Sequence, residues 1–157
     1  YDTPVVKNDA SDISILIQSV KESAKIMKNN SVLIISSQTP VGLCNKLRQI
    51  IKKTNNSLDL AYSPENLRLG EALNNYLNPD RIILGTANKK TEEKCMLLFK
   101  EISNKVMTMN LESAELVKHG INSFLATSIV FSNHLSDVCE KMNADITKVI
   151  NGIKSAS

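Results

Sequence analysis

Short apolar runs alternate with segments of helical periodicity along the first 110 residues of the chain. Four runs have the length and apolar content of buried strands: residues 32–35, 58–62, 82–84 and 106–109. Three segments place apolar residues at helical spacing: residues 12–28, 43–51 and 91–104. Strands and helices that alternate at this spacing predict βαβ units with right-handed crossovers. The pattern therefore predicts an α/β fold, with a Rossmann-like parallel sheet covered by helices.

A long helix is predicted to follow this α/β region. Residues 111–142 contain no proline, and their apolar side chains fall on more than one side of the predicted helix. Such a pattern favours a helix that packs against its own domain and against a second surface. Residues 143–145 are expected to end this helix and to cap a short one over residues 146–150.

The beginning of the chain suggests that it is part of a larger protein. Residues 1–4 directly precede a helix, at a point where a strand of a βαβ unit is expected to have just ended. These residues lack the basic-then-apolar pattern of a signal peptide. No run approaches the roughly 18 apolar residues that a membrane span requires. We therefore expect a cytoplasmic protein that does not act in a membrane.

The composition argues against several kinds of site. The three cysteines, Cys44, Cys95 and Cys139, are far apart, which fits reduced intracellular thiols rather than disulfides or a zinc site. His119 and His134 are too few for most catalytic metal centres, and no metal is expected. The five glycines are isolated from one another, so the chain carries neither a G-x-G-x-x-G nor a Walker loop.

The charge pattern argues against nucleic-acid binding. The chain carries 19 basic and 16 acidic residues, and its net charge is +3. The basic residues are scattered among the acids rather than clustered with aromatic residues, as a nucleic-acid surface would require. A solvated surface explains this pattern.

Polar residues follow the predicted strands at the places where a parallel sheet binds ligands. Thr3-Pro4, residues 36–40 and residues 63–67 all fall at strand ends, and ligands of open sheets bind beyond the carboxyl ends of strands. Taken alone, each segment can be only a turn. Glu65 is the strongest candidate, because a carboxylate that follows a strand and the pair Ser63-Pro64 is aimed at this crevice, although it can instead cap the next segment.

Two polar residues lie in an otherwise apolar part of the long helix. Lys118 and Asn122 are four residues apart and therefore share one helix face. If that face is buried, both side chains need partners, since unpaired burial costs several kcal/mol. The alternative is a stripe that faces solvent. We expect His119, His134 and Cys139 to have packing or surface roles.

Four motifs in order resemble the UDP-glucose/GDP-mannose dehydrogenase family of NAD-dependent nucleotide-sugar dehydrogenases. Residues 36–42 resemble the family turn K-S-T-V-P-x-G, and residues 63–70 resemble N-P-E-F-L-R-E-G. Residues 79–85 are similar to P-D-R-x-V-x-G. Residues 114–134 are similar to A-E-L-x-K-x-x-x-N-A-F-L-A-T-K-I-x-F-x-N-E. The motifs cover nearly the whole chain.

The resemblance implies a domain organisation and a reaction. Residues 1–110 would form the later part of an NAD-binding Rossmann domain, and residues 111–157 the start of a central helical domain used for dimerisation. The family's glycine-rich loop and catalytic cysteine would lie outside the chain, so the isolated chain should not catalyse the family's reaction. The family oxidises the C6 alcohol of a nucleotide sugar to a carboxylate, with two NAD⁺, through an aldehyde and a thioester.

The resemblance also implies a role for each matching residue. Lys118 would stabilise the developing oxyanion, Asn122 would hold the same oxygen or a catalytic water, and Glu65 would be a general base, at least in hydrolysis of the thioester. The nucleotide-sugar substrate would contact Glu65, Asn66, Leu67, Lys118 and Asn122. The NAD side would be lined by Thr3, Ser37, Gln38 and Glu65.

The motifs depart from the family pattern at several positions. The family's threonine in the first turn is replaced by Gln38, and its phenylalanine in the second motif by Asn66. Leu69 replaces a glutamate, Ser128 a lysine and His134 a glutamate. The changes near the sugar put UDP-glucose in doubt and leave room for a UDP-N-acetylhexosamine.

Two alternative functions stay open. A hydroxyacid dehydrogenase of the 6-phosphogluconate type also carries a lysine and an asparagine on a long helix after a Rossmann unit, but it lacks the motifs at residues 63–67 and 79–81. A non-catalytic dimerisation module is the other alternative, motivated by the long two-faced helix. In the favoured hypothesis that same helix joins two copies of the enzyme in a homodimer.

Overall fold

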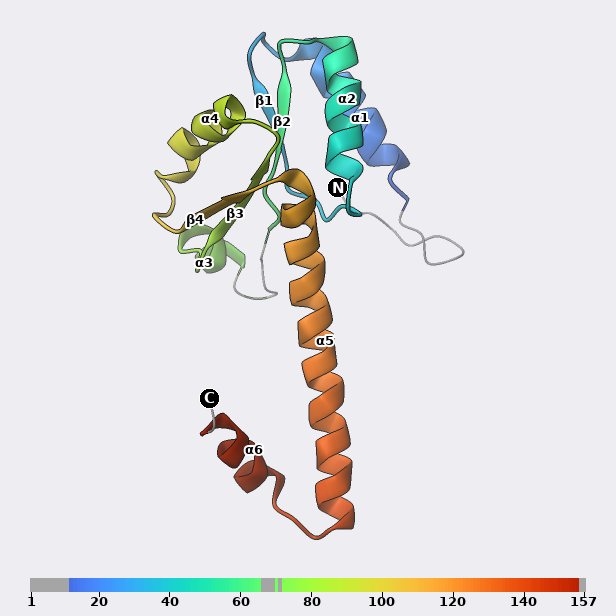
Figure 1. Cartoon of the computed structure of the whole chain (residues 1–157), viewed down its shortest axis with the longest axis vertical. Helices are drawn as coiled ribbons and strands as arrows, with labels where there is room; N and C mark the ends of the chain where they lie inside the picture. Colours follow the sequence, from blue (N-terminus) through green and yellow to red (C-terminus); the bar gives the residue numbers. More distant parts are fainter. Residues whose placement is uncertain (1–11, 66–69, 71, 156–157) are drawn as a thin grey trace. The chain divides into compact units, whose positions relative to one another are not determined.

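The structure is a computed structural model that describes residues 12–65, 70 and 72–155. It divides into two compact units, Tyr1–Lys118 and His119–Ser157. The elements follow one another along the chain as labelled in Figure 1: α1 (Ser14–Ile26), β1 (Val32–Ile35), α2 (Leu43–Thr54), β2 (Asp59–Tyr62), α3 (Ala72–Leu77), β3 (Ile82–Thr86), α4 (Lys89–Phe99), β4 (Val106–Met109), α5 (Leu111–Lys141) and α6 (Ile146–Lys154). The first unit contains the sheet, and the second contains most of α5 together with α6.

The four strands lie side by side in the order β1-β2-β3-β4. The pairs β1–β2 and β3–β4 are parallel, whereas β2 and β3 are antiparallel. The Rossmann-like α/β prediction is confirmed, but the expectation of parallel strands throughout is wrong at this one pair. Parallel neighbours need a crossover that returns the chain to the opposite edge, as α2 and α4 do. Because β2 and β3 are antiparallel, the chain enters β3 from the edge at which it left β2.

Helices cover both faces of the sheet. In Figure 1, α1 and α2 lie on one side of the strands and α4 on the other. Successive residues of a strand point to opposite faces, so Leu60 and Tyr62 pack with α1 and α2, while Ala61 packs with Leu84 and with Cys95 of α4. This burial on both faces explains why the β2 run is apolar almost throughout.

An ionic cluster fixes the amino end of β2. The carboxylate of Asp59 accepts hydrogen bonds from Arg48 Nε at 2.6 Å, from Arg48 Nη2 at 3.3 Å and from Asn88 Nδ2 at 2.8 Å. Asn88 in turn caps α4, because its side chain accepts from the N–H of Thr91. One carboxylate thus ties α2, β2 and the start of α4 together, at the end of β2 opposite to the loop that follows Tyr62.

The remaining helix boundaries test the sequence predictions. Asp145 caps α6 by accepting from the N–H groups of Thr147 and Lys148, as predicted, and α6 continues to Lys154, beyond the predicted end at residue 150. The long helix α5 has 31 residues and is confirmed. The short helix α3 was not predicted, because six residues with two asparagines give no helical period.

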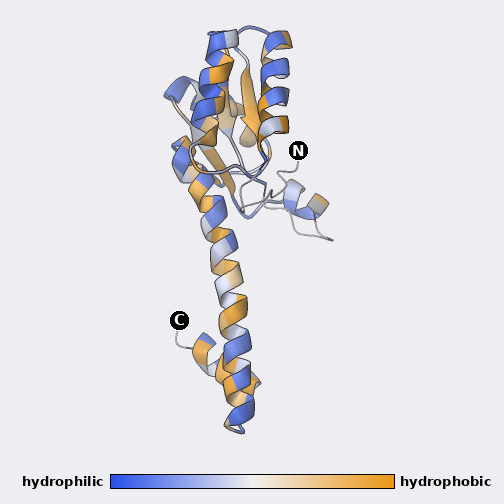
Figure 2. Cartoon of the chain, turned by 90° about the vertical axis from the view of Figure 1, so that its right-hand side faces the viewer, coloured by the Kyte–Doolittle hydropathy of each residue, from blue (hydrophilic) through white to orange (hydrophobic). Residues whose placement is uncertain are grey.

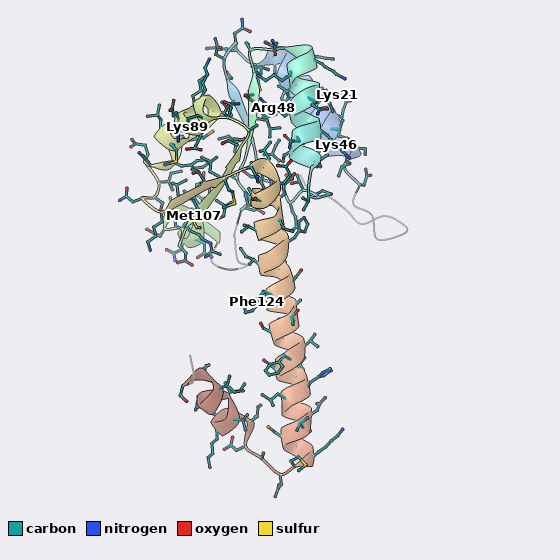
Figure 3. All side chains as sticks on the ribbon, in the orientation of Figure 1. Lys21, Lys46, Arg48, Lys89, Met107 and Phe124 are labelled. Carbon is teal, nitrogen blue, oxygen red and sulfur yellow. The ribbon has the colours of Figure 1, made fainter. Side chains whose placement is uncertain are left out.

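The second unit exposes large apolar side chains along α5. Phe124 is 75% exposed and projects from the helix (Figure 3), and Phe131 is 57% exposed. Figure 2 shows apolar and polar residues interleaved along this helix. Within the described part of the second unit these apolar residues are not covered. Among the described residues, no helix combines the length and apolarity that crossing a membrane requires.

Candidate active site

Two polar loops meet at one edge of the sheet. Residues 36–42 connect β1 to α2, and residues 63–65 continue from β2. Because β1 and β2 are parallel, both loops leave the same edge, as predicted. The N–H of Ser63 donates to the carbonyl of Ile35 at 2.9 Å, and the N–H of Glu65 donates to the carbonyl of Ser36 at 3.4 Å. The edge has the position at which open α/β sheets bind ligands.

Lys118 reaches this edge from α5. Its Nζ donates a hydrogen bond to the backbone carbonyl of Glu65 at 2.8 Å. The first turns of α5 are held on the sheet, because Leu111 and Ala114 are buried in the core formed by α1, α2 and the strands. The ammonium group of Lys118, a half-buried residue, is therefore fixed beside the loop that follows β2. An ammonium has three N–H donors, so this contact leaves it able to bind further acceptors.

The structure brings Glu65 and Lys118 together through the main chain of Glu65, and their catalytic roles stay predictions. The side chain of Glu65 is exposed, and its carboxylate is not the group that Lys118 contacts. The carbonyl orients the lysine, and the carboxylate stays accessible at the same edge. The two groups of Glu65 can therefore have separate roles.

Of the residues Asn122, Thr3, Asn66 and Leu67, which the sequence also predicts for the site, the structure describes one. Asn122 lies on α5, four residues after Lys118, in the second unit, and its side chain is exposed. That Asn122 acts together with Lys118 at one site stays a prediction. Thr3, Asn66 and Leu67 lie outside the described residues, so their roles stay predictions.

Glu115 is a functional candidate that the sequence analysis did not single out. Its side chain is completely buried, and three groups donate to its carboxylate. The N–H of Gly42 donates to Oε2 at 2.6 Å, the N–H of Cys44 to Oε1 at 2.8 Å, and the Thr39 hydroxyl to Oε1 at 3.2 Å. The motif A-E-L-x-K contains this acid, but nothing local in the sequence marks it as buried, because its donors lie far away along the chain.

The loop 36–42 places its side chains differently along its length. Thr39 is buried, and its hydroxyl is engaged by Glu115. Ser37 is half-buried and Gln38 is exposed. The hydroxyl of Thr39 is therefore held in the core by Glu115, whereas Gln38 lies at the surface of the loop. The correspondence of Gln38 to the family's threonine stays a prediction.

The buried thiol and phenol beside Glu115 stay protonated. Burial, and then the neighbouring carboxylate of Glu115, raises the pKa of the Cys44 thiol well above its ordinary value of 9.0. Burial also raises the pKa of the Tyr62 phenol above 10.0. A thiol in this state is a poor nucleophile, so the geometry assigns Cys44 a packing role.

The arrangement of this edge is that of a Rossmann-like α/β protein. A mainly parallel sheet covered on both faces, with two polar loops and a fixed cation at the carboxyl ends of β1 and β2, fits the Rossmann-like class. In the described part of the chain, no group of three or more His, Cys, Asp or Glu residues is arranged to hold a metal ion.

Comparison with known proteins assigns the family. Residues 1–103 match the NAD binding domain of the UDP-glucose/GDP-mannose dehydrogenase family, and residues 112–157 match the central domain of the same family. The chain belongs to the UDP-glucose/GDP-mannose dehydrogenase family. The resemblance found in the sequence motifs is thereby confirmed.

Individual relatives agree with this assignment. The chain is 32% identical to a UDP-glucose 6-dehydrogenase of Rickettsia bellii, and the match covers 96% of the chain and 36% of the relative. It is 31% identical to the UDP-glucose 6-dehydrogenase TuaD of Bacillus subtilis, over 96% of the chain and 33% of the relative. The chain thus spans about a third of the length of the curated relatives that it matches.

Solved structures of the family share the fold. A ternary complex of GDP-mannose dehydrogenase from Pseudomonas aeruginosa matches 99% of the chain and 38% of its own length, with a TM-score of 0.89 and 20% identity. A UDP-glucose dehydrogenase from Pyrobaculum islandicum matches 97% of the chain and 37% of its own length, with a TM-score of 0.88 and 23% identity.

Proposed function

We propose that the whole protein is an NAD-dependent nucleotide-sugar 6-dehydrogenase, which oxidises the C6 alcohol of a UDP-sugar to a carboxylate and reduces two NAD⁺. In this proposal, residues 1–110 belong to the NAD-binding domain and residues 111–157 begin the central helical domain. The observation that carries the proposal is the 2.8 Å contact between Lys118 Nζ and the Glu65 carbonyl at the carboxyl edge of the sheet. Family membership supports the reaction class.

The residues at this edge carry the types of polar group that bind a dinucleotide. Ser37 and Gln38 offer a hydroxyl and an amide on the loop that follows β1, and Glu65 offers a carboxylate beside them. Such groups donate to and accept from ribose hydroxyls and a carboxamide. NAD⁺, when bound, supplies the acceptor for the hydride in both oxidations. Thr3 is proposed to complete the cofactor side.

Lys118 is proposed to stabilise negative charge on the sugar oxygen. As C6 is oxidised, and again when the aldehyde is attacked, charge develops on this oxygen. A cation that is already oriented by the Glu65 carbonyl needs no reorganisation to meet that charge, which is the main source of such stabilisation. Asn122 is proposed to bind the same oxygen or the catalytic water.

Glu65 is proposed to act as a general base through its carboxylate. Its carbonyl holds Lys118, and its exposed carboxylate is free to accept a proton from the water that hydrolyses the thioester. Asn66 and Leu67 are proposed to contact the sugar. Because Asn66 and Leu69 replace the family's phenylalanine and glutamate, a UDP-N-acetylhexosamine is proposed as a substrate alongside UDP-glucose.

The exposed apolar residues of α5 support a homodimer. Phe124, Leu125, Ile129 and Phe131 are each more than half exposed within the second unit, which is unusual for an uncovered surface. A homodimer through this helix is proposed to bury them. We expect Phe124→Asp to convert the whole protein to a monomer in sedimentation, and a wild-type monomer would contradict this part of the proposal.

The free thiols Cys44, Cys95 and Cys139 support a cytoplasmic location.

The test is an assay of the whole protein with NAD⁺ and a panel of substrates. UDP-glucose, UDP-N-acetylglucosamine and UDP-N-acetylmannosamine are offered in parallel with 6-phosphogluconate. We expect two NADH for each molecule of one of the UDP-sugars. Turnover of 6-phosphogluconate alone would favour the hydroxyacid alternative, and a dimer without turnover of any substrate would favour the dimerisation module. The isolated chain is expected to be inactive.

A variant pair makes this test specific to the site. We expect Lys118→Met to lower kcat by about 10²–10³-fold, as loss of one stabilising donor does in other enzymes. The matched control is Lys21→Met, which removes an exposed ammonium from α1. Equal activity of the two variants would contradict the role of Lys118.

A further inference from the structure

Glu115 places a carboxyl group in the core of the first unit. The side chain is 0% exposed, and its carboxylate lies at the amino end of α2. Burial of an ionised carboxylate costs several kcal/mol unless hydrogen bonds and opposite charge compensate it. A carboxyl group at such a position needs a reason beyond filling space, because an apolar side chain would fill it at lower cost.

The compensation comes from the first turn of α2. The N–H groups of Gly42 and Cys44 donate to Glu115, and the amino end of a helix carries partial positive charge. Gly42 is the N-cap of α2, with a positive φ of 87°, and it offers no side chain to cap the helix. Glu115 thus supplies from α5 the acceptor that an N-cap residue ordinarily supplies locally.

The same helix face carries both contacts to the candidate site. Glu115 and Lys118 are three residues apart on α5 and are therefore neighbours on its surface. Glu115 is bonded to the loop that follows β1, and Lys118 to the loop that follows β2. These two contacts fix the first turns of α5 to both loops, so the place of the Lys118 ammonium depends on where Glu115 is held.

We propose that Glu115 is a positioning residue, whose carboxylate locks α5 to the loop 36–42 and thereby holds Lys118 Nζ where it meets the reacting oxygen. The proposal rests on the proposed function for its effect on catalysis. Thr39 helps to hold the Glu115 carboxylate in place, since its buried hydroxyl donates to Glu115 Oε1 at 3.2 Å. Neither residue touches substrate in this proposal, and both act through Lys118.

The test compares four variants of the whole protein. Glu115→Gln keeps the shape of the side chain but replaces one acceptor oxygen by a donor. Thr39→Val removes the hydroxyl at nearly constant volume, and Thr39→Ser restores it. Glu112→Gln is the matched control, because Glu112 stands one turn earlier on α5 and accepts from Asn45 of α2, but is exposed.

Each variant has an expected kinetic result. We expect Glu115→Gln to lower kcat by about 10²-fold with KM for both substrates nearly unchanged, because a small misplacement of a catalytic group has an effect of this size. Thr39→Val should lower kcat by about tenfold, and Thr39→Ser should return it to the wild-type value. Glu112→Gln should match wild type. A folded Glu115→Gln protein with wild-type kcat would overturn the proposal; if that variant does not fold, wild-type kcat in Thr39→Val would overturn it.

A second measurement separates this proposal from the proposed function. The rate of reductive methylation of Lys118, followed by peptide mass spectrometry relative to exposed Lys148, reports how firmly the ammonium is held without any need for turnover. We expect Glu115→Gln, or Thr39→Val where the first variant does not fold, to increase this rate several-fold. If the wild-type protein oxidises no nucleotide sugar, a faster rate still supports positioning by Glu115. An unchanged rate in the folded variant overturns it.

Discussion

Gly85 of β3 and Ala114 of α5 are packed so closely that a Cβ atom on Gly85 would lie 2.6 Å from the Cβ of Ala114. The same added atom would lie 3.3 Å from the Cα of Leu111, which belongs to the backbone of the helix. The first turn of α5 therefore rests directly on the sheet. Because Ala114 directly precedes Glu115 on α5, this contact also fixes where Glu115 and Lys118 lie relative to the loops that follow β1 and β2.

Gly85→Ala tests this close packing. The added methyl group must displace the start of α5, since no flexible side chain is there to move aside. We expect the free energy of unfolding to fall by about 1–3 kcal/mol, the usual cost of overpacking. Urea unfolding of the chain measures it. In the whole protein, kcat should fall as well, because Lys118 moves with α5.

The matched control is Gly120→Ala. Gly120 lies in the interior of α5, and a Cβ atom there meets nothing within 4 Å. Alanine is the better helix former by about 1 kcal/mol, so this variant should be as stable as wild type or more stable. A Gly85→Ala protein as stable as Gly120→Ala would contradict the packing argument.

Asp59 makes the stability of the first unit depend on pH. Burial by itself raises the pKa of Asp59, but hydrogen bonds from Arg48, from the N–H of Leu60 and from Asn88 outweigh it and hold the pKa well below 3.8. A carboxyl group whose pKa is lower in the folded state stabilises that state above its unfolded pKa of about 3.9, and the stabilisation is lost as the pH falls through the folded pKa.

Asp59→Asn measures that contribution. At about pH 7 we expect the variant to be less stable than wild type by roughly 1–3 kcal/mol, as for hydrogen bonds to a charged group. The difference in urea midpoint should shrink as the pH falls below about 4. Glu93→Gln, which changes an exposed acid of α4, is the control and should follow wild type. A difference that stays constant down to low pH would contradict the lowered pKa.

The two buried thiols of the first unit should be inert. Burial raises the pKa of Cys44 and of Cys95, so the reactive thiolate is scarce even in mildly alkaline solution. We expect neither residue to react with iodoacetamide in the folded chain, and both to react in urea. Mass spectrometry of the alkylated peptides measures this. Rapid labelling of Cys44 in the folded protein would show that the α2–α5 contact opens.

The sequence predicted the elements that have a local signal. The strands at residues 32–35 and 106–109 have the predicted bounds, because each is an apolar run between polar turns. The antiparallel direction of β3 was not predictable in this way. The apolar pattern of a strand is the same whether the strand runs parallel or antiparallel to its neighbour. The direction of β3 is decided by the path of the chain between Tyr62 and Ile82. The short helix α3 lies in that same segment, where no periodicity marks it.

The residues of the candidate site also divide into those that the sequence marks and those that it does not. Glu65 and Lys118 could be named from their motifs, and the structure brings them together. Glu115 could not, since its donors Thr39, Gly42 and Cys44 are 71 to 76 residues away in the sequence. A glutamate in a helix ordinarily faces solvent. Only the packing of α5 on α2 reveals that this one is buried.

The two groups of Glu65 lead to the sharpest kinetic prediction. Glu65→Gln keeps the backbone carbonyl that orients Lys118 and removes the carboxylate that is proposed to activate water. Both oxidations should therefore proceed, and hydrolysis of the thioester should become slow. General-base catalysis contributes about 10²–10⁴-fold, so steady-state kcat should fall by a factor in that range.

The form of the progress curve distinguishes this mechanism from simple loss of activity. Because the thioester accumulates, the whole protein carrying Glu65→Gln should release a burst of about two NADH per active site before a slow steady state. Stopped-flow absorbance of NADH measures the amplitude, and mass spectrometry of the quenched protein should detect the bound acyl group. Lys118→Met should give no such burst, since it slows the oxidations themselves. A Glu65→Gln protein that lacks the burst would show that the carboxylate acts before the thioester forms, and would move the role of Glu65 to the first oxidation.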